Sequence, residues 1–115
     1  MRHREEIILQ ITDAIEGELR RLELWELHTP APEALLSEQP FCFDTLTFTQ
    51  WLQWIFLVRV RKTITNGLPL PTRSDIHPLA EHVFADLDFD SAALLKSIKR
   101  FDRAISQSPD DTGSP

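Results

Sequence analysis

The chain has 115 residues, which suits a single domain that can bury its own hydrophobic core. It contains 42% hydrophobic and 26% charged residues, as globular proteins do, and its longest apolar run, residues 54–58, is too short to span a membrane. The net charge of −6 disfavours nucleic-acid binding, because phosphate contacts need clustered Lys and Arg. The single cysteine, Cys42, excludes an internal disulfide, and the absence of a signal-peptide pattern favours a cytoplasmic location without membrane association.

Residues 3–26 carry the pattern of a long amphipathic helix. Apolar residues recur at three- and four-residue intervals and form one stripe that faces a core: Ile8, Ile11, Ile15, Leu19, Leu22 and Trp25. Glu5 and Glu6 near the start and Arg20 and Arg21 near the end complement the helix dipole.

Residues 28–46 form a long, proline-rich connection, because proline cannot continue the first helix. Phe41 and Phe43 alternate around Cys42, which predicts an extended segment with both aromatic rings on the core. Between two aromatic residues, Cys42 is expected to be a small core residue rather than a reactive thiol.

The most informative stretch is a helix expected over residues 48–66. Thr47 and Gln50 have the spacing of a capping box, and Gly67 followed by a proline is a typical helix stop. If each residue turns by about 100°, one face of this helix contains Phe48, Trp51, Leu52, Ile55 and Val58. The opposite face contains Trp54, Leu57, Val60 and Ile64.

A helix that is apolar on both sides is either buried or keeps one face for a partner. The candidate partner face is therefore Trp54, Leu57, Val60 and Ile64. Trp51 and Trp54 are also able to stack on nucleic-acid bases, but their helical spacing favours positions in the core and at its rim.

Arg59 falls near the middle of the face that contains Phe48, where a guanidinium must be paired because its burial is otherwise very costly. Asp44 is the first candidate partner, and carboxylates of the first helix, such as Glu16 or Glu23, come second. Such a buried ion pair would pin the long connection to the bundle. The alternative is a site for an anionic ligand.

Two further helices are expected after a proline-rich loop. The first covers residues 77–86, and the second begins at Asp88 or Asp90 and ends near Ser106. The inner apolar stripe of the last helix is Leu94 or Leu95, Ile98, Phe101 and Ile105. Its outer stripe is basic and is the candidate RNA face: Lys96, Lys99, Arg100 and Arg103.

No segment shows the alternation that is typical of a strand. The sequence therefore predicts an all-α fold, a small four-helix bundle with one long proline-rich crossover between helices 1 and 2. The bundle would occupy residues 1–106 as a single domain. Residues 107–115 lack core-forming side chains and are expected to be a disordered tail.

The sequence offers little support for catalysis. It contains no nucleophile elbow, no phosphate-binding loop and no dinucleotide fingerprint. Of the four histidines, only His77 and His82 are near each other, and their spacing takes them off a shared helical face. We therefore expect no catalytic residue, no metal site and no cofactor.

Several motifs are similar to those of the YqcC-like family of small bacterial proteins. They are Ser37-Glu-Gln-Pro-Phe41, Asp44-Thr45, Trp51-Leu-Gln-Trp54 and Arg59, extended by Trp25 and by Leu70-Pro71. The resemblance covers most of residues 5–105 and implies a cytoplasmic, all-α four-helix bundle without established enzymatic activity. Family members often carry proline where this chain has Val58, so the kink expected of the family is not expected here.

The resemblance also implies a link to tRNA modification. Genes of this family are often found beside the gene for tRNA pseudouridine synthase C, and members are sometimes labelled with that activity by association. Such synthases use a catalytic Asp in an Arg-Leu-Asp setting on a much larger β-rich domain. The nearest string here is Arg21-Leu22-Glu23 in a predicted helix, so synthase activity is the least supported reading.

The sequence thus predicts a non-catalytic helical protein-interaction module, an accessory factor linked to tRNA pseudouridine modification. Its expected partner is tRNA pseudouridine synthase C or a second copy of the chain. The alternative is an RNA-binding protein that uses the basic face of the last helix.

Overall fold

The computed structural model describes residues 3–106, and all regular secondary structure in this range is helical. The long helical stretches are α1 (His3–Arg21), the continuous helix α3–η2–α4 (Phe48–Trp51, Leu52–Phe56 and Leu57–Thr65), α5 (Ile76–Phe84) and α6 (Ala92–Ser106). Two short elements lie in the crossover, α2 (Pro32–Leu35) and the 3₁₀ turn η1 (Pro40–Cys42). The predicted all-α bundle with one long crossover is confirmed, whereas the predicted tail, residues 107–115, lies outside the described residues.

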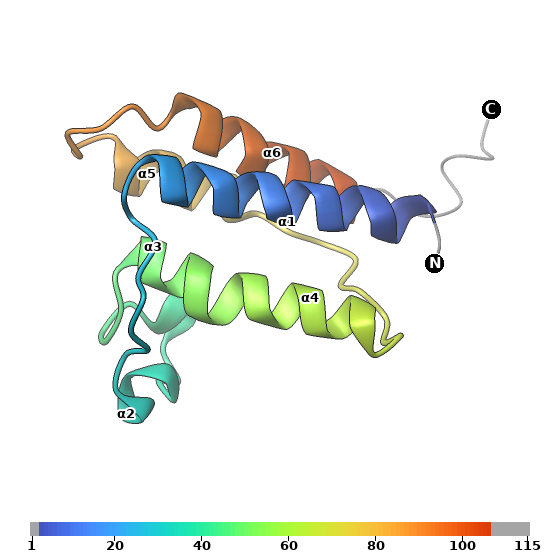
Figure 1. Ribbon diagram of the computed structural model, residues 1–115, viewed down its shortest axis with the longest axis horizontal. Coiled ribbons are helices and arrows are strands. Elements are labelled where there is room, and N and C mark those ends of the chain that lie inside the picture. Colours follow the sequence, from blue (N-terminus) through green and yellow to red (C-terminus); the bar gives the residue numbers. More distant parts are fainter. Residues whose placement is uncertain (1–2, 107–115) are drawn as a thin grey trace.

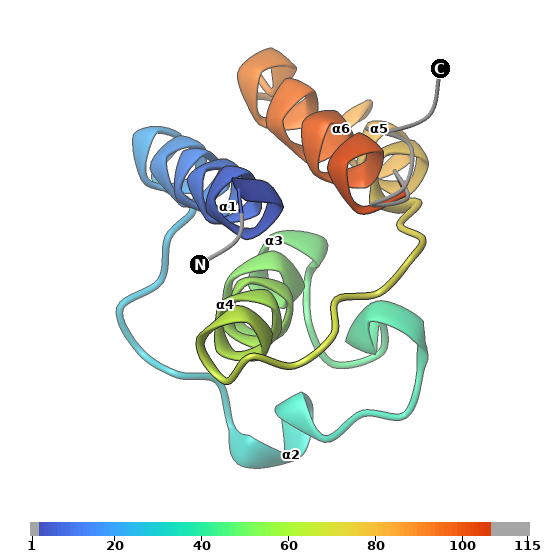
Figure 2. The same ribbon diagram turned by 90° about the vertical axis from the view of Figure 1, so that its right-hand side faces the viewer.

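The helices pack around the long helix α3–η2–α4. α1 and α6 run side by side, and α5 packs against α6 (Figure 1). In the end-on view of Figure 2, α4 has α1 and α6 on one side and the segment that carries α2 on the other. The buried side chains of α1 and α6 include those of the two predicted stripes: Ile8, Ile11, Ile15, Leu19, Leu94, Ile98, Phe101 and Ile105.

Two helix ends are capped by side chains from neighbouring helices. The Arg4 guanidinium of α1 donates to the carbonyl of Ile105 at 3.0 Å, near the C-terminus of α6. Asp102 of α6 accepts hydrogen bonds from the backbone N–H groups of Ile76 (3.1 Å) and His77 (2.7 Å) at the N-terminus of α5. Each charge has the sign that complements the dipole of the helix it caps, so these contacts join the helix ends electrostatically.

The first helix ends at Arg21 rather than at residue 26, because the chain turns at Glu23. Glu23 has a φ of 60°, and the N–H of Leu24 bonds back to the carbonyl of Leu19 at 2.8 Å. This is the Schellman motif, which usually has glycine at the left-handed position. The same motif closes α4 at Gly67, with a φ of 67°, as the sequence predicted.

Candidate interaction site

The long helix does not keep a constant turn. Its start has the predicted capping box, in which Thr47 Oγ1 accepts from the Gln50 N–H at 3.2 Å and Gln50 Oε1 accepts from the Thr47 N–H at 2.8 Å. η2 is then a π-helical turn, in which the N–H of Leu57 donates to the carbonyl of Leu52, five residues earlier. Because a π-helical turn holds one more residue than an α-helical turn, everything after it is displaced around the axis by about one position.

This displacement changes which side chains face the core. Up to the first residue of the turn, the buried residues are those expected: Phe48, Trp51 and Leu52. From the last residue of the turn onward, the buried residues are Phe56, Leu57, Val60 and Ile64. The candidate partner face, Trp54 with Leu57, Val60 and Ile64, was therefore wrong, since three of its members lie in the core and Trp54 is half-buried. The prediction failed because it assumed a regular α-helix.

The same displacement takes Arg59 out of the core. Arg59 and Asp44 are both exposed, so the predicted buried ion pair is wrong. The guanidinium that ties the long helix to α1 is that of Arg61, which bonds Glu16 at 2.7 Å and Asp13 at 2.9 Å. Glu16 was among the expected carboxylates, but its partner lies two positions further along the chain.

Glu16 receives a second guanidinium from its own helix, because Arg20 Nε donates to it at 2.9 Å. Partial desolvation on its own would raise the pKa of Glu16. The hydrogen bonds and charges of Arg61 and Arg20 outweigh desolvation and hold the pKa of Glu16 below its ordinary value. The carboxylate is therefore ionised at neutral pH and stabilises the contact between α1 and α4.

Glu26 is held by three side chains of the long helix. Its carboxylate accepts hydrogen bonds from Gln50 Nε2 and Trp54 Nε1, each 3.0 Å long. Gln53 binds the Glu26 backbone twice, accepting from its N–H at 2.8 Å and donating to its carbonyl at 2.7 Å. Glu26, Gln50, Gln53 and Trp54 are named here the Glu26 clamp. Gln53 is buried, so its bonds satisfy polar groups that water does not reach.

Sequence reasoning missed the Glu26 clamp because Glu26 lies far along the chain from its three partners. One signal pointed to it: Gln53 and Trp54 carry polar groups in an otherwise apolar helix, and such groups need partners when buried. The motif Trp51-Leu-Gln-Trp54 therefore has a structural meaning. Trp51 and Leu52 enter the core, and the next two residues hold the crossover.

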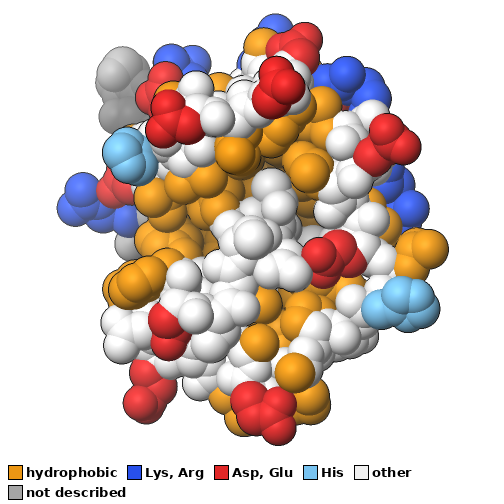
Figure 3. Space-filling view, turned by 90° about the vertical axis from the view of Figure 1, so that its left-hand side faces the viewer, with side chains coloured by type: hydrophobic (Ala, Val, Ile, Leu, Met, Phe, Trp, Pro, Cys, Tyr) orange, Lys and Arg blue, Asp and Glu red, His pale blue; other side chains and the backbone are white. Residues whose placement is uncertain are grey.

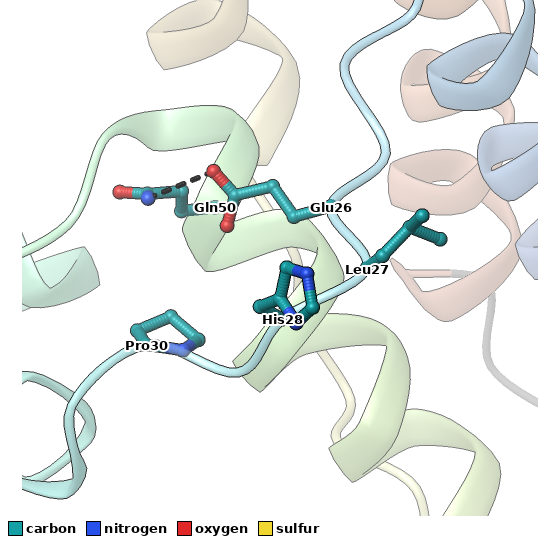
Figure 4. Close-up of a pocket in the computed structure, with 5 residues that line it drawn as sticks. All are labelled: Glu26, Leu27, His28, Pro30 and Gln50. Atoms are coloured by element: carbon teal, nitrogen blue, oxygen red, sulfur yellow. Dashed lines mark hydrogen bonds between the residues drawn. The ribbon is translucent and has the colours of Figure 1, made fainter.

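A shallow, open pocket lies beside the clamp and is lined by Glu26, Leu27, His28, Pro30 and Gln50 (Figure 4). The Glu26 and Gln50 side chains that line it are bonded to each other, and Leu27 and His28 are exposed to solvent. Because two donors already occupy the Glu26 carboxylate, the pocket offers few free polar groups that could orient a small ligand.

Residues 32–46, named here the lobe, project from the bundle on the far side of α4 from α1 (Figure 2). Ser37 donates to Asp44, and Thr45 Oγ1 donates to the carbonyl of Ala34 at 2.7 Å, so two of the motifs that resemble the YqcC-like family close the lobe. Cys42 is buried, as predicted.

The predicted extended segment at the end of the lobe is wrong. Phe41 and Cys42 both adopt a positive φ, of 56° and 50°, within a 3₁₀ turn. This turn places the Phe41 ring against Trp51, with 4.7 Å between ring centroids, and leaves Phe43 exposed rather than on the core.

The candidate RNA face is exposed on α6. Its members are Lys96, Lys99, Arg100 and Arg103, and all four are exposed to solvent. Among residues 3–106, no group of three or more His, Cys, Asp or Glu side chains is placed to hold a metal ion. Within the same range, no helix has the length and apolar character needed to cross a membrane.

The fold and the clamp define a small helical bundle in which a polar cluster holds a long crossover onto a central helix. Residues 7–104 match a protein family described as tRNA pseudouridine synthase C. The chain therefore belongs to this family, DUF446, in agreement with its resemblance to YqcC-like proteins.

Three similar proteins place the chain more closely. An uncharacterized protein of Haemophilus influenzae is 38% identical over 80 residues, which are 70% of each chain. The uncharacterized protein YqcC of Escherichia coli is 32% identical over 89 residues, 77% of this chain and 82% of that one. The tRNA pseudouridine synthase C of Pectobacterium carotovorum subsp. carotovorum is 38% identical over 68 residues, which are 59% of this chain and 18% of that protein.

The solution NMR structure of YqcC from E. coli has the same fold. It matches this chain with a TM-score of 0.80 and 27% identity, over 91% of this chain and 90% of that chain.

The clamp predicts that Gln50→Glu destabilises the fold although it preserves the capping box. A glutamate still accepts from the Thr47 N–H, but it cannot donate to Glu26 and places a second carboxylate beside it. We expect the free energy of unfolding, measured by urea denaturation, to fall by about 2 kcal/mol. The exchanged pair Glu26→Gln with Gln50→Glu should recover much of this loss. An unchanged midpoint for the single variant would contradict the clamp.

Acidification should remove the contribution of Glu16 to the stability of the fold. Because the folded-state pKa of Glu16 lies below the ordinary value of 4.5, its contribution to stability is complete above pH 4.5 and disappears as pH falls through the folded-state pKa. Glu16→Gln should therefore lower the free energy of unfolding by about 1 kcal/mol at pH 7, and this difference should shrink below pH 4.5. The matched control is Glu38→Gln, at an exposed position of the lobe. A pH-independent difference would refute the assignment.

Proposed function

We propose that this protein is a non-catalytic accessory module that binds tRNA pseudouridine synthase C. The observation that carries the proposal is the relation to the Pectobacterium protein of that name, in which the matching 68 residues form 18% of a much longer chain. A module that is joined to an enzyme in one polypeptide is held near it by the linker, and the proposed role further requires that the module contacts the enzyme through its own surface.

The chemistry of the described residues supports binding rather than catalysis. The Glu26 carboxylate is engaged by two donors. In the string Arg21-Leu22-Glu23, Arg21 is paired with Glu18, and Glu23 occupies the left-handed position of a helix end. These groups therefore serve the structure of the bundle. The proposed role implies a cytoplasmic location, where tRNA is modified.

The proposal predicts direct association between this chain and tRNA pseudouridine synthase C of the same organism. Titration calorimetry with the two purified proteins should show a dissociation constant of about 10 μM or tighter, and an unrelated pseudouridine synthase serves as the control. The chain alone should form no pseudouridine in unmodified tRNA. Absence of binding, or pseudouridine formation by the chain alone, would refute this function. A stable homodimer that does not bind the synthase would assign the chain to self-association instead.

A second candidate function is RNA binding through the basic face of α6. The observation that favours it is that Lys96, Lys99, Arg100 and Arg103 are all exposed and share one stripe of the helix. Nothing in the described α6 neutralises this stripe from within, because the acidic side chain of the helix, Asp102, is bonded to the start of α5.

RNA binding predicts a steep dependence on salt. In filter binding with unmodified tRNA, affinity should be measurable at about 50 mM salt and should fall by roughly ten-fold or more at about 200 mM. Added salt weakens binding because binding releases counterions from the phosphates. Lys99→Glu with Arg103→Glu should abolish binding, whereas Lys62→Glu on α4 is the control. Absence of binding at low salt would remove this candidate.

A further inference from the structure

The most exposed large apolar side chains of the described chain lie in the crossover. Leu27, Leu36 and Phe43 are 83%, 77% and 68% exposed, whereas Leu68, on the loop after α4, is 53% exposed. Leu36 and Phe43 each directly precede one member of the bonded pair Ser37 and Asp44, so both belong to the part of the lobe that this bond closes. Exposed apolar side chains that gather in one place mark interaction sites, whereas scattered ones need no explanation.

The backbone of the lobe is conformationally strained where it holds Phe43 in solvent. Phe41 and Cys42 both occupy the left-handed region, where a residue other than glycine is strained by roughly 1–2 kcal/mol. This strained backbone places the Phe41 ring against Trp51 and Cys42 in the core, and it leaves the Phe43 ring in solvent. Strained, over-determined backbone of this kind is concentrated at binding sites.

The charged residues around Leu36 and Phe43 in the sequence are all acidic. Residues 22–58 contain five Asp and Glu residues and no Lys or Arg. Three of the five, Glu33, Glu38 and Asp44, are exposed in the lobe. Figure 3 shows the face of the molecule on the side of the lobe, where acidic and hydrophobic side chains lie in both the upper and the lower part, whereas Lys and Arg lie toward the edges and none is visible in the lower part.

We infer that the lobe is a docking surface for a basic protein surface that carries apolar side chains. Leu36 and Phe43 supply the apolar contact, and the exposed carboxylates attract Lys and Arg of the partner. RNA is excluded at this surface, because its phosphates would be repelled by the carboxylates. The inference rests on the proposed function, since an enzyme that binds tRNA has to carry a basic surface.

The test measures binding of the full chain to purified tRNA pseudouridine synthase C by titration calorimetry. Phe43→Ser and Leu36→Ser should each weaken binding by about ten-fold or more, with the melting temperature unchanged because both side chains are exposed. Glu33→Lys with Glu38→Lys should weaken it similarly, and added salt should weaken wild-type binding. Leu68→Ser, at an exposed apolar position outside the lobe, is the matched control and should bind like the wild type.

The outcomes separate this inference from the proposed function. Wild-type binding that none of the lobe variants changes would overturn the docking surface and leave the proposed function standing. Absence of wild-type binding would overturn both. An oligomer of the chain alone that Phe43→Ser dissociates would assign the lobe to a second copy and overturn the basic partner.

Discussion

The hydrogen bonds between Glu26 and the π-helical turn are the constraint on which the rest of the architecture depends. Gln53 and Trp54 belong to η2 itself, so their bonds to Glu26 join the crossover to the one turn that holds an extra residue. The extra residue in this turn decides which side chains of the following helix, α4, face the core. Val60 and Ile64 turn into the core, Arg59 turns to solvent, and Arg61 reaches the carboxylates of α1.

The features that the sequence predicted well are those set by neighbours along the chain. The capping box of Thr47 and Gln50, the helix stop at Gly67 and the stripes of α1 and α6 depend on spacings of three or four residues. The π-helical turn has no such signature. The helix is apolar on both sides, so its composition fits a regular register and a displaced one equally well, and only contacts from distant residues select between them.

The residues with a positive φ also show that local sequence pattern predicts only part of the backbone conformation. Gly67 adopts a positive φ without cost, and the sequence predicted it correctly. Glu23, Phe41 and Cys42 adopt positive φ values against their own preference. Local backbone bonds of the helix end hold Glu23, whereas contact with Trp51 holds Phe41 and burial in the core holds Cys42. The early end of α1, the exposure of Phe43 and the shape of the lobe all follow from these three residues, so none could be predicted from local pattern.

The motifs that resemble the YqcC-like family therefore serve mainly to build and position the crossover: Gln53 and Trp54 hold its beginning, and Ser37, Asp44 and Thr45 close its lobe. Function then depends on what the crossover presents to solvent. The lobe and α6 lie on opposite sides of α4 (Figure 2), and the acidic residues of the lobe and the basic residues of α6 suit different partners. A basic protein on the lobe leaves α6 uncovered, so protein binding at one surface and RNA binding at the other are compatible within a single bundle.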